Sequence, residues 1–434
     1  MKKYKKLLSV IPKECHWVLC DQNILRSMHL GVPVQRKLKG NIFKKLLYTF
    51  RFEFFRYFII ALFGFLEISR LWFRQSNKNK ILNKNNFPIK EPIKIFLTCN
   101  IFVLSEIYNN YCKLSSEKVI KVVQDDISSM SSIYHVNFFS LLKYFRKSFS
   151  TIKILQQNIL FEFNNYRLEL LTSAARRIAL YSFTRTFWEG MKETFNVLEV
   201  NLLNADISAY AAIDAGLNTK FQLHGLLSYS VLVGNFNNIS LLSRSEARYI
   251  ETLPVNCSIE HRKPILPQDF ISRELTKTIV LVSDLVTEED LSMYLEAIYY
   301  FNTLNYKIVI KTKAKTGLLN SQEYWKKIIN KHKFKTVSID VDCSFEILIK
   351  DLRPKFVLAQ SSTVLVDSLY LGIIPITFCK EDDIEIKDTV YPLLYSCLRW
   401  DIDQNRIKEM SLGKLDYNSV LKVLLNNELI YEYH

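Results

Sequence analysis

The chain has 434 residues, of which 58 are Lys or Arg and 43 are Asp or Glu, so its formal net charge is +15. Hydrophobic residues make up 49% of the chain and charged residues 23%, which excludes intrinsic disorder. With only 10 Gly and 10 Pro, the chain is neither collagen-like nor of low complexity, and its length suffices for two or three domains.

Residues 1–90 form a basic and aromatic N-terminal segment. Its start holds no apolar stretch of the roughly 7–15 residues that a signal peptide needs, so a cytoplasmic protein is expected. The longest uncharged run, 57–66, is half of the about 20 residues of a membrane-spanning helix. Basic residues flank this run: Lys44, Lys45, Arg51, Arg56, Arg70 and Arg74. Two interpretations stay open, a core helix or a helix that lies on the inner surface of the membrane.

The eight Cys residues are scattered along the chain. No pair has the CxxC or Cys/His spacing of a zinc site, and several lie inside apolar runs, as Cys379 does. We therefore expect reduced, mostly buried thiols in a reducing compartment, and no metal site.

Residues 91–265 are predicted to form a first Rossmann-like domain. Short apolar runs at 93–98 and 119–123 indicate buried strands, and 138–200 has the pattern of long helices with few breakers. Further strands are expected at 207–211 and 220–223. Asp125 and Asp126 follow the second apolar run and are candidate bases on the acceptor side.

In residues 266–434, strand and helix patterns alternate clearly. Apolar runs predict strands at 278–283, 306–311, 336–339, 356–359 and 374–378. Such alternation is typical of a parallel sheet with helices on both faces. The expected fold class is α/β, with two Rossmann-like, doubly wound domains facing a cleft and an extra helical N-terminal segment. Ligands of such folds bind at the carboxyl ends of the strands, in the crevice between the halves.

A short polar motif separates the predicted strand at 356–359 from the next helix: Gln360, Ser361, Ser362 and Thr363. Small hydroxyl residues in this place can cap the helix, whose free amides and dipole then favour an anion. A phosphate or pyrophosphate is one reading, and capping without a ligand is the other. Asp367 lies one turn into the helix, which is followed by Leu-Gly-Ile-Ile-Pro-Ile.

This order of features resembles the nucleotide-binding segment of inverting GT-B glycosyltransferases. It is most similar to those of bacterial surface polysaccharides such as capsule, lipopolysaccharide and teichoic acid, over about residues 275–400. The resemblance implies that Ser361, Ser362 and Thr363 contact donor phosphate, and that Gln360 and Asp367 belong to the same donor site. It also implies that the second domain binds a nucleotide-sugar, as a substrate and not a cofactor, while the first domain takes the acceptor.

His224 and Gly225 follow the predicted strand at 220–223. They resemble the strand-end His-Gly of the same enzymes. A histidine has an ordinary pKa of about 6.5 and can accept the proton of an acceptor hydroxyl, and a glycine lets the backbone approach a ligand. The alternative is a lone histidine that hydrogen-bonds a loop.

Charged residues also follow two other predicted strands. Lys311 and Lys313 end or follow the strand at 306–311, where related enzymes carry a basic residue together with a His-Pro that this chain lacks. These lysines can neutralise donor phosphate as point charges, or form a solvated loop. Asp284, after the strand at 278–283, is a candidate contact for the base or ribose, or a solvated residue.

The expected function is that of a metal-independent, inverting glycosyltransferase. It would move a sugar from a CMP- or other nucleotide-linked donor to a bacterial cell-surface glycan or lipid-linked acceptor, with His224 or an acidic residue as base. A polyol-phosphate transferase and a non-catalytic scaffold of a glycan assembly complex remain alternatives, and the missing His-Pro favours the scaffold. The basic residues are spread along the chain without a nucleic-acid-binding motif, so no nucleic-acid partner is expected.

Overall fold

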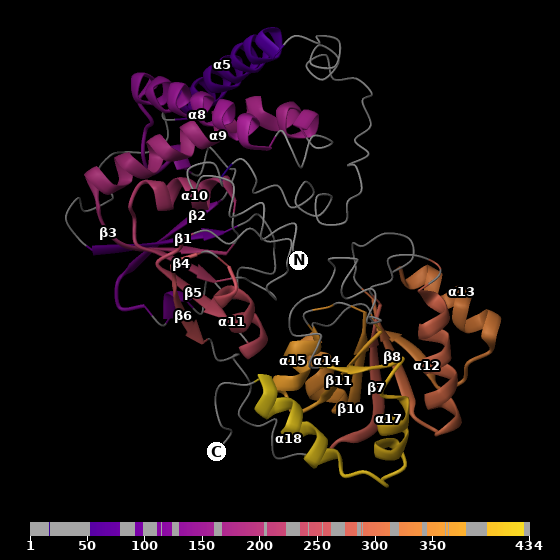
Figure 1. The fold of residues 1–434 in the computed structure, drawn as a ribbon. Helices are drawn as coiled ribbons and strands as arrows, with labels where there is room; N and C mark the ends of the chain where they lie inside the picture. Colours follow the sequence, from indigo (N-terminus) through magenta and orange to yellow (C-terminus); the bar gives the residue numbers. More distant parts are fainter. Residues whose placement is uncertain are drawn as a thin grey trace. The chain divides into compact units, whose positions relative to one another are not determined.

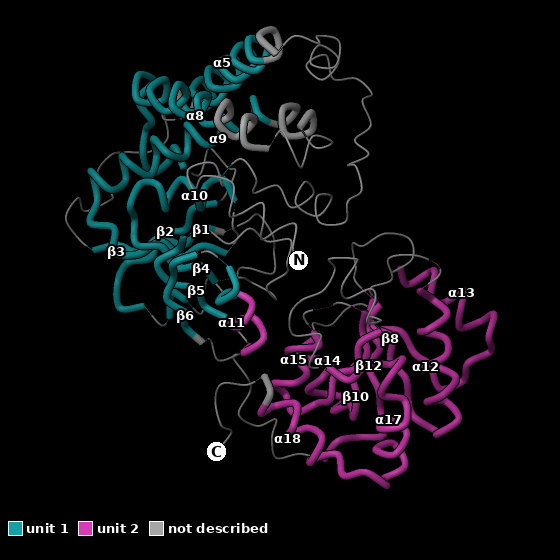
Figure 2. Tube along the Cα trace, in the orientation of Figure 1, with its two compact units in different colours: residues 1–224, 229–241, 250–260 teal, residues 225–228, 242–249, 261–434 magenta. Residues whose placement is uncertain are grey.

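The computed structural model divides into two compact units, which are described separately (Figures 1 and 2). Unit 1 comprises residues 1–224, 229–241 and 250–260, and unit 2 comprises residues 225–228, 242–249 and 261–434. The structure describes residues 17, 53–78, 92–98, 111–113, 115–123, 130–159, 167–203, 206–222, 235–241, 243–253, 255–261, 274–283, 288, 290–312, 321–340, 345–360, 362, 364–378 and 397–428.

The sheet of unit 1 has six strands in the order β2-β1-β3-β4-β5-β6. The pairings β2–β1, β1–β3, β3–β4 and β4–β5 are parallel. Its strands are β1 (Pro92–Thr98), β2 (Lys118–Val123), β3 (Asn196–Leu202), β4 (Thr219–Gln222), β5 (Asn238–Leu241) and β6 (Ser258–His261). The chain order reverses direction between β1 and β3, which makes this junction the topological switch point of the unit.

Helices are stacked over the sheet of unit 1 (Figure 1). The long helix α9 contacts α5, α8, α10 and strand β3. The helices are α5 (Glu53–Lys78), α8 (Phe138–Ile159), α9 (Arg167–Thr194), α10 (Ile207–Asp214) and α11 (Arg244–Glu251), the last of which lies mostly in unit 2. Aromatic pairs join α5 to α8 in antiparallel register, with ring centroids 6.2 Å apart for Tyr57 and Phe149 and 5.2 Å apart for Trp72 and Phe138.

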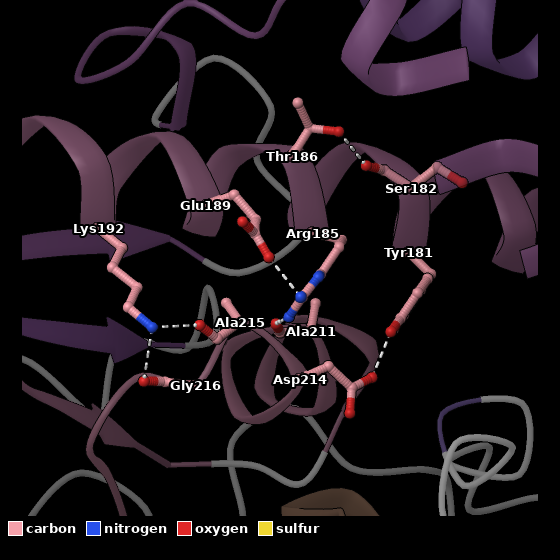
Figure 3. Close-up of polar contacts among 10 residues, drawn as sticks. All are labelled: Tyr181, Ser182, Arg185, Thr186, Glu189, Lys192, Ala211, Asp214, Ala215 and Gly216. Atoms are coloured by element: carbon pink, nitrogen blue, oxygen red, sulfur yellow. Dashed lines mark hydrogen bonds and ion pairs between the residues drawn. The ribbon is translucent and has the colours of Figure 1, made fainter. Parts of the chain in front are cut away.

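Polar side chains of α9 satisfy the C-terminal end of α10 (Figure 3). Lys192 Nζ donates to the carbonyl oxygens of Ala215 and Gly216, at 3.0 and 3.2 Å. These carbonyls follow the last turn of α10 and have no partner within that helix. A cation there also complements the negative end of the helix dipole. The hydroxyl of Tyr181 donates to the carboxylate of Asp214, which fixes the same turn of α10 to α9.

Removing the hydroxyl of Tyr181 is expected to lower the stability of unit 1 and to change how that stability depends on pH above 10. Burial, and then the Asp214 carboxylate, raise the pKa of Tyr181 above its ordinary value of 10.0. A tyrosine whose pKa is raised in the folded state makes its full contribution to stability below pH 10. This contribution is lost as the pH rises further, because the tyrosine ionises first in the unfolded chain. We expect Tyr181→Phe to lower the free energy of unfolding by about 1 kcal/mol at neutral pH, and by less above pH 10.

Urea denaturation of the full chain at pH 7 and pH 10.5 (about half a unit above the ordinary tyrosine pKa) measures both effects. Tyr299→Phe is the matched control, because Tyr299 is 47% exposed. An equal loss at both pH values would contradict the assigned role of the Tyr181–Asp214 hydrogen bond.

The sheet of unit 2 has the strand order β12-β11-β10-β7-β8-β9, with every pairing parallel. Its strands are β7 (Thr276–Val282), β8 (Lys307–Lys311), β9 (Val337–Asp340), β10 (Pro354–Ala359), β11 (Ile374–Thr377) and β12 (Leu398–Arg399). Strands β7, β8 and β9 follow one another toward one edge of the sheet, and β10, β11 and β12 follow one another toward the other edge. This is the 3-2-1-4-5-6 order of a Rossmann sheet, with the switch point between β7 and β10.

Apolar side chains alternate between the two faces of this sheet, as the two-residue period of a strand requires. In β7, Ile279 and Leu281 join one core cluster, while Val280 and Val282 join the other. The first cluster is completed mainly by helices α12 (Leu291–Thr303), α13 (Gln322–His332), α17 (Gln404–Ser411) and α18 (Tyr417–Glu428). The second is completed by α14 (Phe345–Leu352) and the side of α15 (Val364–Tyr370) that carries Leu365. Both faces are therefore covered, which explains why the strands are nearly continuous apolar runs.

The structure confirms the predicted fold class of two Rossmann-like α/β domains. Two local predictions are wrong. Residues 196–200, expected at the end of a long helix, belong to strand β3, because no Gly or Pro after α9 marks its end. Residues 207–211, expected as a strand, begin helix α10. Nearly every residue of this short helix is buried, so it has no polar face, and the Asp206 cap (accepting from Ala209 N at 2.8 Å) is the signal that marks its start.

Candidate functional site

Three polar side chains lie in one row at the carboxyl ends of β10, β7 and β8. Leu358 pairs with Leu281, and Val282 pairs with Lys311. Continuing this register places Gln360, Ser283 and Thr312 side by side on adjacent strands, about 4.8 Å from strand to strand. The ladder does continue, because Ser283 N donates to Lys311 O at 2.9 Å. We call these three residues the strand-end row, and it spans the switch point of unit 2.

The strand-end row is buried, although it is polar. The exposed fractions are 9% for Gln360, 0% for Ser283 and 1% for Thr312. Ser283 is held from the helix layer, because Trp325 Nε1 in α13 donates to its Oγ at 2.6 Å. That contact puts the row on the same side of the sheet as α12 and α13. Buried polar groups at the ends of otherwise apolar strands are the feature that distinguishes this edge of the sheet.

The hydroxyl of Thr312, unlike that of Ser283, has no hydrogen-bond partner among the described residues. Its Oγ1 is also inaccessible to solvent. The backbone of the residue is satisfied, since Thr312 N donates to Asp340 O at 3.1 Å. A buried hydroxyl without a partner destabilises a protein by about 1–3 kcal/mol, so such a group needs a reason to be kept.

The polar motif predicted to contact phosphate lies where β10 passes into α15. Thr377 Oγ1 of β11 donates to the carbonyl oxygen of Gln360 at 2.7 Å, which fixes the first residue of the motif. Ser362 is 6% exposed, and its carbonyl oxygen accepts from Leu365 N at 3.2 Å, in the first turn of α15. Asp367 lies in that helix and is partly buried. Ser361 and Thr363 lie outside the described residues.

Lys311 is placed on the opposite side of the sheet from the strand-end row, because side chains alternate along β8. Its Nζ lies 3.4 Å from Asp340 Oδ1 on the neighbouring strand β9, and its side chain is 12% exposed. The role of Lys311 in binding phosphate stays a prediction, and it would require the lysine to share its charge with Asp340. Lys313 and Asp284 lie outside the described residues.

In unit 1, Glu199 and Asn201 lie on the same face of β3, and each forms a hydrogen bond with a residue of another segment. The hydroxyl of Tyr111 donates to Glu199 Oε1 at 2.8 Å, and Asn201 Nδ2 donates to Gln222 Oε1 at 3.3 Å. Asn201 is fully buried, and its Oδ1 has no hydrogen-bond partner among the described residues. Burial, and then the charge of Glu199, raise the pKa of Tyr111, so it acts as a neutral donor.

The predicted catalytic residues belong to this unit but lie outside the described residues. They are His224, Asp125 and Asp126. The strands that precede them in the chain, β4 and β2, are separated in the sheet by β3 and β1. Their roles stay predictions. Gly225, which was predicted to contact the donor, also lies outside the described residues and belongs to unit 2.

Ser283, Thr312 and Asn201 are not among the residues predicted from the sequence. A signal for the first two is present, because each directly follows an apolar strand, the position at which parallel sheets bind ligands. Thr312 lies between Lys311 and Lys313, the two residues of this segment that were predicted to contact phosphate. Asn201 lies in the strand that was predicted as helix, so its position could not be inferred.

Within the described ranges, no group of three or more His, Cys, Asp or Glu side chains is placed to hold a metal ion. Among the helices in those ranges, none is both long and apolar enough to cross a membrane.

No protein-family model and no curated protein matches the chain. Solved structures of similar architecture do exist. A glycosyltransferase from Rickettsia africae matches 78% of this chain and 94% of its own, with 9% identity and a TM-score of 0.41. A UDP-N-acetylglucosamine 2-epimerase from Rickettsia bellii matches 79% and 96%, with 13% identity and a TM-score of 0.41. The UDP-GlcNAc 2-epimerase of Methanocaldococcus jannaschii matches 77% and 99%, with 10% identity and a TM-score of 0.42.

Proposed function

We propose that the chain is a glycosyltransferase whose unit 2 binds a nucleotide-sugar donor at the carboxyl edge of its sheet. The observation that carries this proposal is the strand-end row, a buried polar row in register across the switch point of a Rossmann sheet. Open parallel sheets bind nucleotides outside the carboxyl ends of the strands at this junction. The hydroxyl-rich motif around Ser362 follows one of the two strands that flank the junction.

The donor contacts follow from the chemistry of these residues. Ser361, Ser362 and Thr363 would donate hydroxyl and backbone hydrogen bonds to the phosphate oxygens, which favours the departing nucleotide as charge develops on it. Lys313 would add positive charge to the same group, and Asp284 would accept from a ribose or base. Thr312 would donate the hydrogen bond that its hydroxyl lacks among the described residues.

The transfer itself needs an acceptor and a base, which we assign to unit 1. His224 would accept the proton of the acceptor hydroxyl, with Asp125 or Asp126 as the alternative base. The acceptor oxygen then forms a bond to the anomeric carbon, and the bond from that carbon to the phosphate oxygen breaks on the opposite face. The nucleotide leaves with the electron pair, and the configuration inverts. A bacterial surface glycan or its lipid-linked precursor is the proposed acceptor, and Gly225 would let the backbone approach the donor.

A thermal-unfolding panel of the full chain tests the donor site. The ligands are CMP, CDP, UDP and GDP with the corresponding nucleotide-sugars. A ligand at a hundredfold excess over its dissociation constant adds about 2.7 kcal/mol to stability, so one nucleotide should raise the unfolding midpoint. We expect Ser362→Ala to weaken that ligand by about tenfold, as the loss of a hydrogen bond to a charged group implies.

Ser368→Ala is the matched control for this variant. Ser368 is fully buried in α15, the helix that follows Ser362, and its hydroxyl donates to Val364 O within that helix. Equal losses of affinity in both variants would point to a general change in α15 rather than to a contact with the ligand. If no nucleotide raises the unfolding midpoint, the proposal of a donor site in unit 2 is wrong. Binding without turnover of any nucleotide-sugar would point to a scaffold, and transfer of a phosphorylated polyol to a polyol-phosphate transferase.

A further inference from the structure

Helix α5 exposes an apolar face. Twelve large apolar side chains are exposed in the part of the chain that the structure describes, and half of them lie on α5 and at the start of α8. Their exposed fractions run from 42% for Phe65 to 80% for Phe139. We call five of them the α5 face: Phe58, Leu62, Phe65, Leu66 and Phe73.

These five side chains lie on one side of the helix. Their spacing of three, four and seven residues repeats the period of an α-helix. The opposite side carries Ile60, Ile68 and Leu71, which are buried toward the rest of unit 1. A surface helix of a soluble domain normally presents a polar face to water, so α5 has a second apolar face that the core does not use.

Aromatic contacts continue this face onto α8. The ring of Trp72 packs 5.3 Å from Phe73 and 5.2 Å from Phe138, and Phe138 lies 6.5 Å from Phe139. Phe139 is the most exposed of the large apolar residues in the described part of the chain. The apolar surface thus extends across two helices rather than ending at the edge of one.

Most charged residues of α5 and α8 are basic. Helices α5 and α8 together contain eight Lys and Arg residues and two Glu, and α8 contains no acidic residue. One Glu is already neutralised, because Glu67 forms an ion pair with Arg70 at 2.6 Å. Lys143, Arg146 and Lys147 are exposed on α8. Apolar side chains beside basic ones complement a bilayer with anionic headgroups, which accepts both.

We propose that the α5 face lies in the interface of an anionic membrane, with the helix parallel to the surface. The apolar side chains enter the boundary between headgroups and acyl chains, and the lysines and arginines contact the headgroups. The helix does not span the bilayer, because four Lys or Arg and two Glu interrupt its 26 residues. This inference is independent of the donor site in unit 2.

Flotation with phospholipid vesicles tests the proposal on the full chain. One set of vesicles contains phosphatidylcholine alone, and the other contains phosphatidylglycerol as well. We expect binding to the anionic vesicles to exceed binding to the neutral ones, and to fall as salt screens the headgroup charge. The variant Phe58→Gln, Leu62→Gln, Phe65→Gln and Phe73→Gln should bind at least about tenfold more weakly.

A matched variant carries the same change at exposed apolar residues of unit 2: Ile347→Gln, Ile402→Gln, Leu412→Gln and Val423→Gln. It should bind like the unchanged protein. Both variants alter exposed side chains, so both should keep the circular dichroism spectrum and the unfolding midpoint. Unchanged vesicle binding by the α5-face variant would overturn the proposal. A second result would also overturn it. If the unchanged chain binds no vesicles and is a dimer in analytical ultracentrifugation, while the α5-face variant is a monomer, the α5 face joins two copies of the chain.

Discussion

Tyr417→Phe is expected to lower the free energy of unfolding of unit 2 by about 2–3 kcal/mol, because one hydroxyl satisfies backbone groups of two strands. The Tyr417 hydroxyl donates to Lys355 O of β10 at 2.8 Å and accepts from Ile374 N of β11 at 2.8 Å. Ile374 is fully buried, so its amide would lose its partner where water cannot replace it. Burial also raises the pKa of Tyr417, which keeps the hydroxyl protonated and able to do both.

Urea denaturation, followed by circular dichroism, measures this loss. Tyr299→Phe is the matched control in the same unit, because its hydroxyl lies at an exposed position, 2.7 Å from the side-chain atom Nδ1 of His332. We expect the control to lose less than about 1 kcal/mol. Similar losses in the two variants would show that the Tyr417 hydroxyl does not hold β10 and β11 together.

Thr312→Val is expected to have opposite effects on the empty and the nucleotide-bound protein. Valine has the shape of threonine without the hydroxyl, and Thr312 Oγ1 is buried without a partner among the described residues. Removing such a group should raise the free energy of unfolding by about 1 kcal/mol. If the hydroxyl donates to the nucleotide phosphate, the same change should weaken nucleotide binding about 10- to 100-fold.

Thermal unfolding with and without nucleotide measures both effects in one experiment. Thr303→Val is the matched control, because Thr303 is an exposed residue at the end of α12, and its hydroxyl already donates to Tyr300 O at 2.6 Å. A stabilised variant with unchanged nucleotide binding would remove Thr312 from the donor site. A destabilised variant would show that the hydroxyl has a structural partner instead.

Part of the candidate site could be predicted from the sequence, but the pairing of its strands could not. The apolar runs before Ser283, Thr312 and Gln360 identify three strand ends, since a buried parallel strand is a near-continuous apolar run. No local pattern states that these ends are adjacent, because adjacency depends on which strands pair and in which register. The register of β10 with β7 joins residues more than 70 positions apart in the chain.

The N-terminal helix illustrates the same limit. Its apolar and basic composition is visible in the sequence, and this composition left a core helix and a membrane-surface helix open as interpretations. In the structure, Ile60 and Ile68 are buried, as a core helix requires, while Phe58 and Phe65 are exposed, and contact with a membrane stays a prediction. Periodicity cannot separate an apolar residue that faces the core from one that faces outward when both sides of a helix are apolar.

By itself, the sequence of this protein determined the α/β class, the alternation of strands and helices in unit 2, and the position of the polar motif after β10, because these depend on residues near one another in the chain. The tertiary structure alone decided the Rossmann strand order, the strand-end row and the exposure of the α5 face. These depend on which surfaces pack together, and packing maximises the burial of apolar area over the whole unit rather than over any one segment.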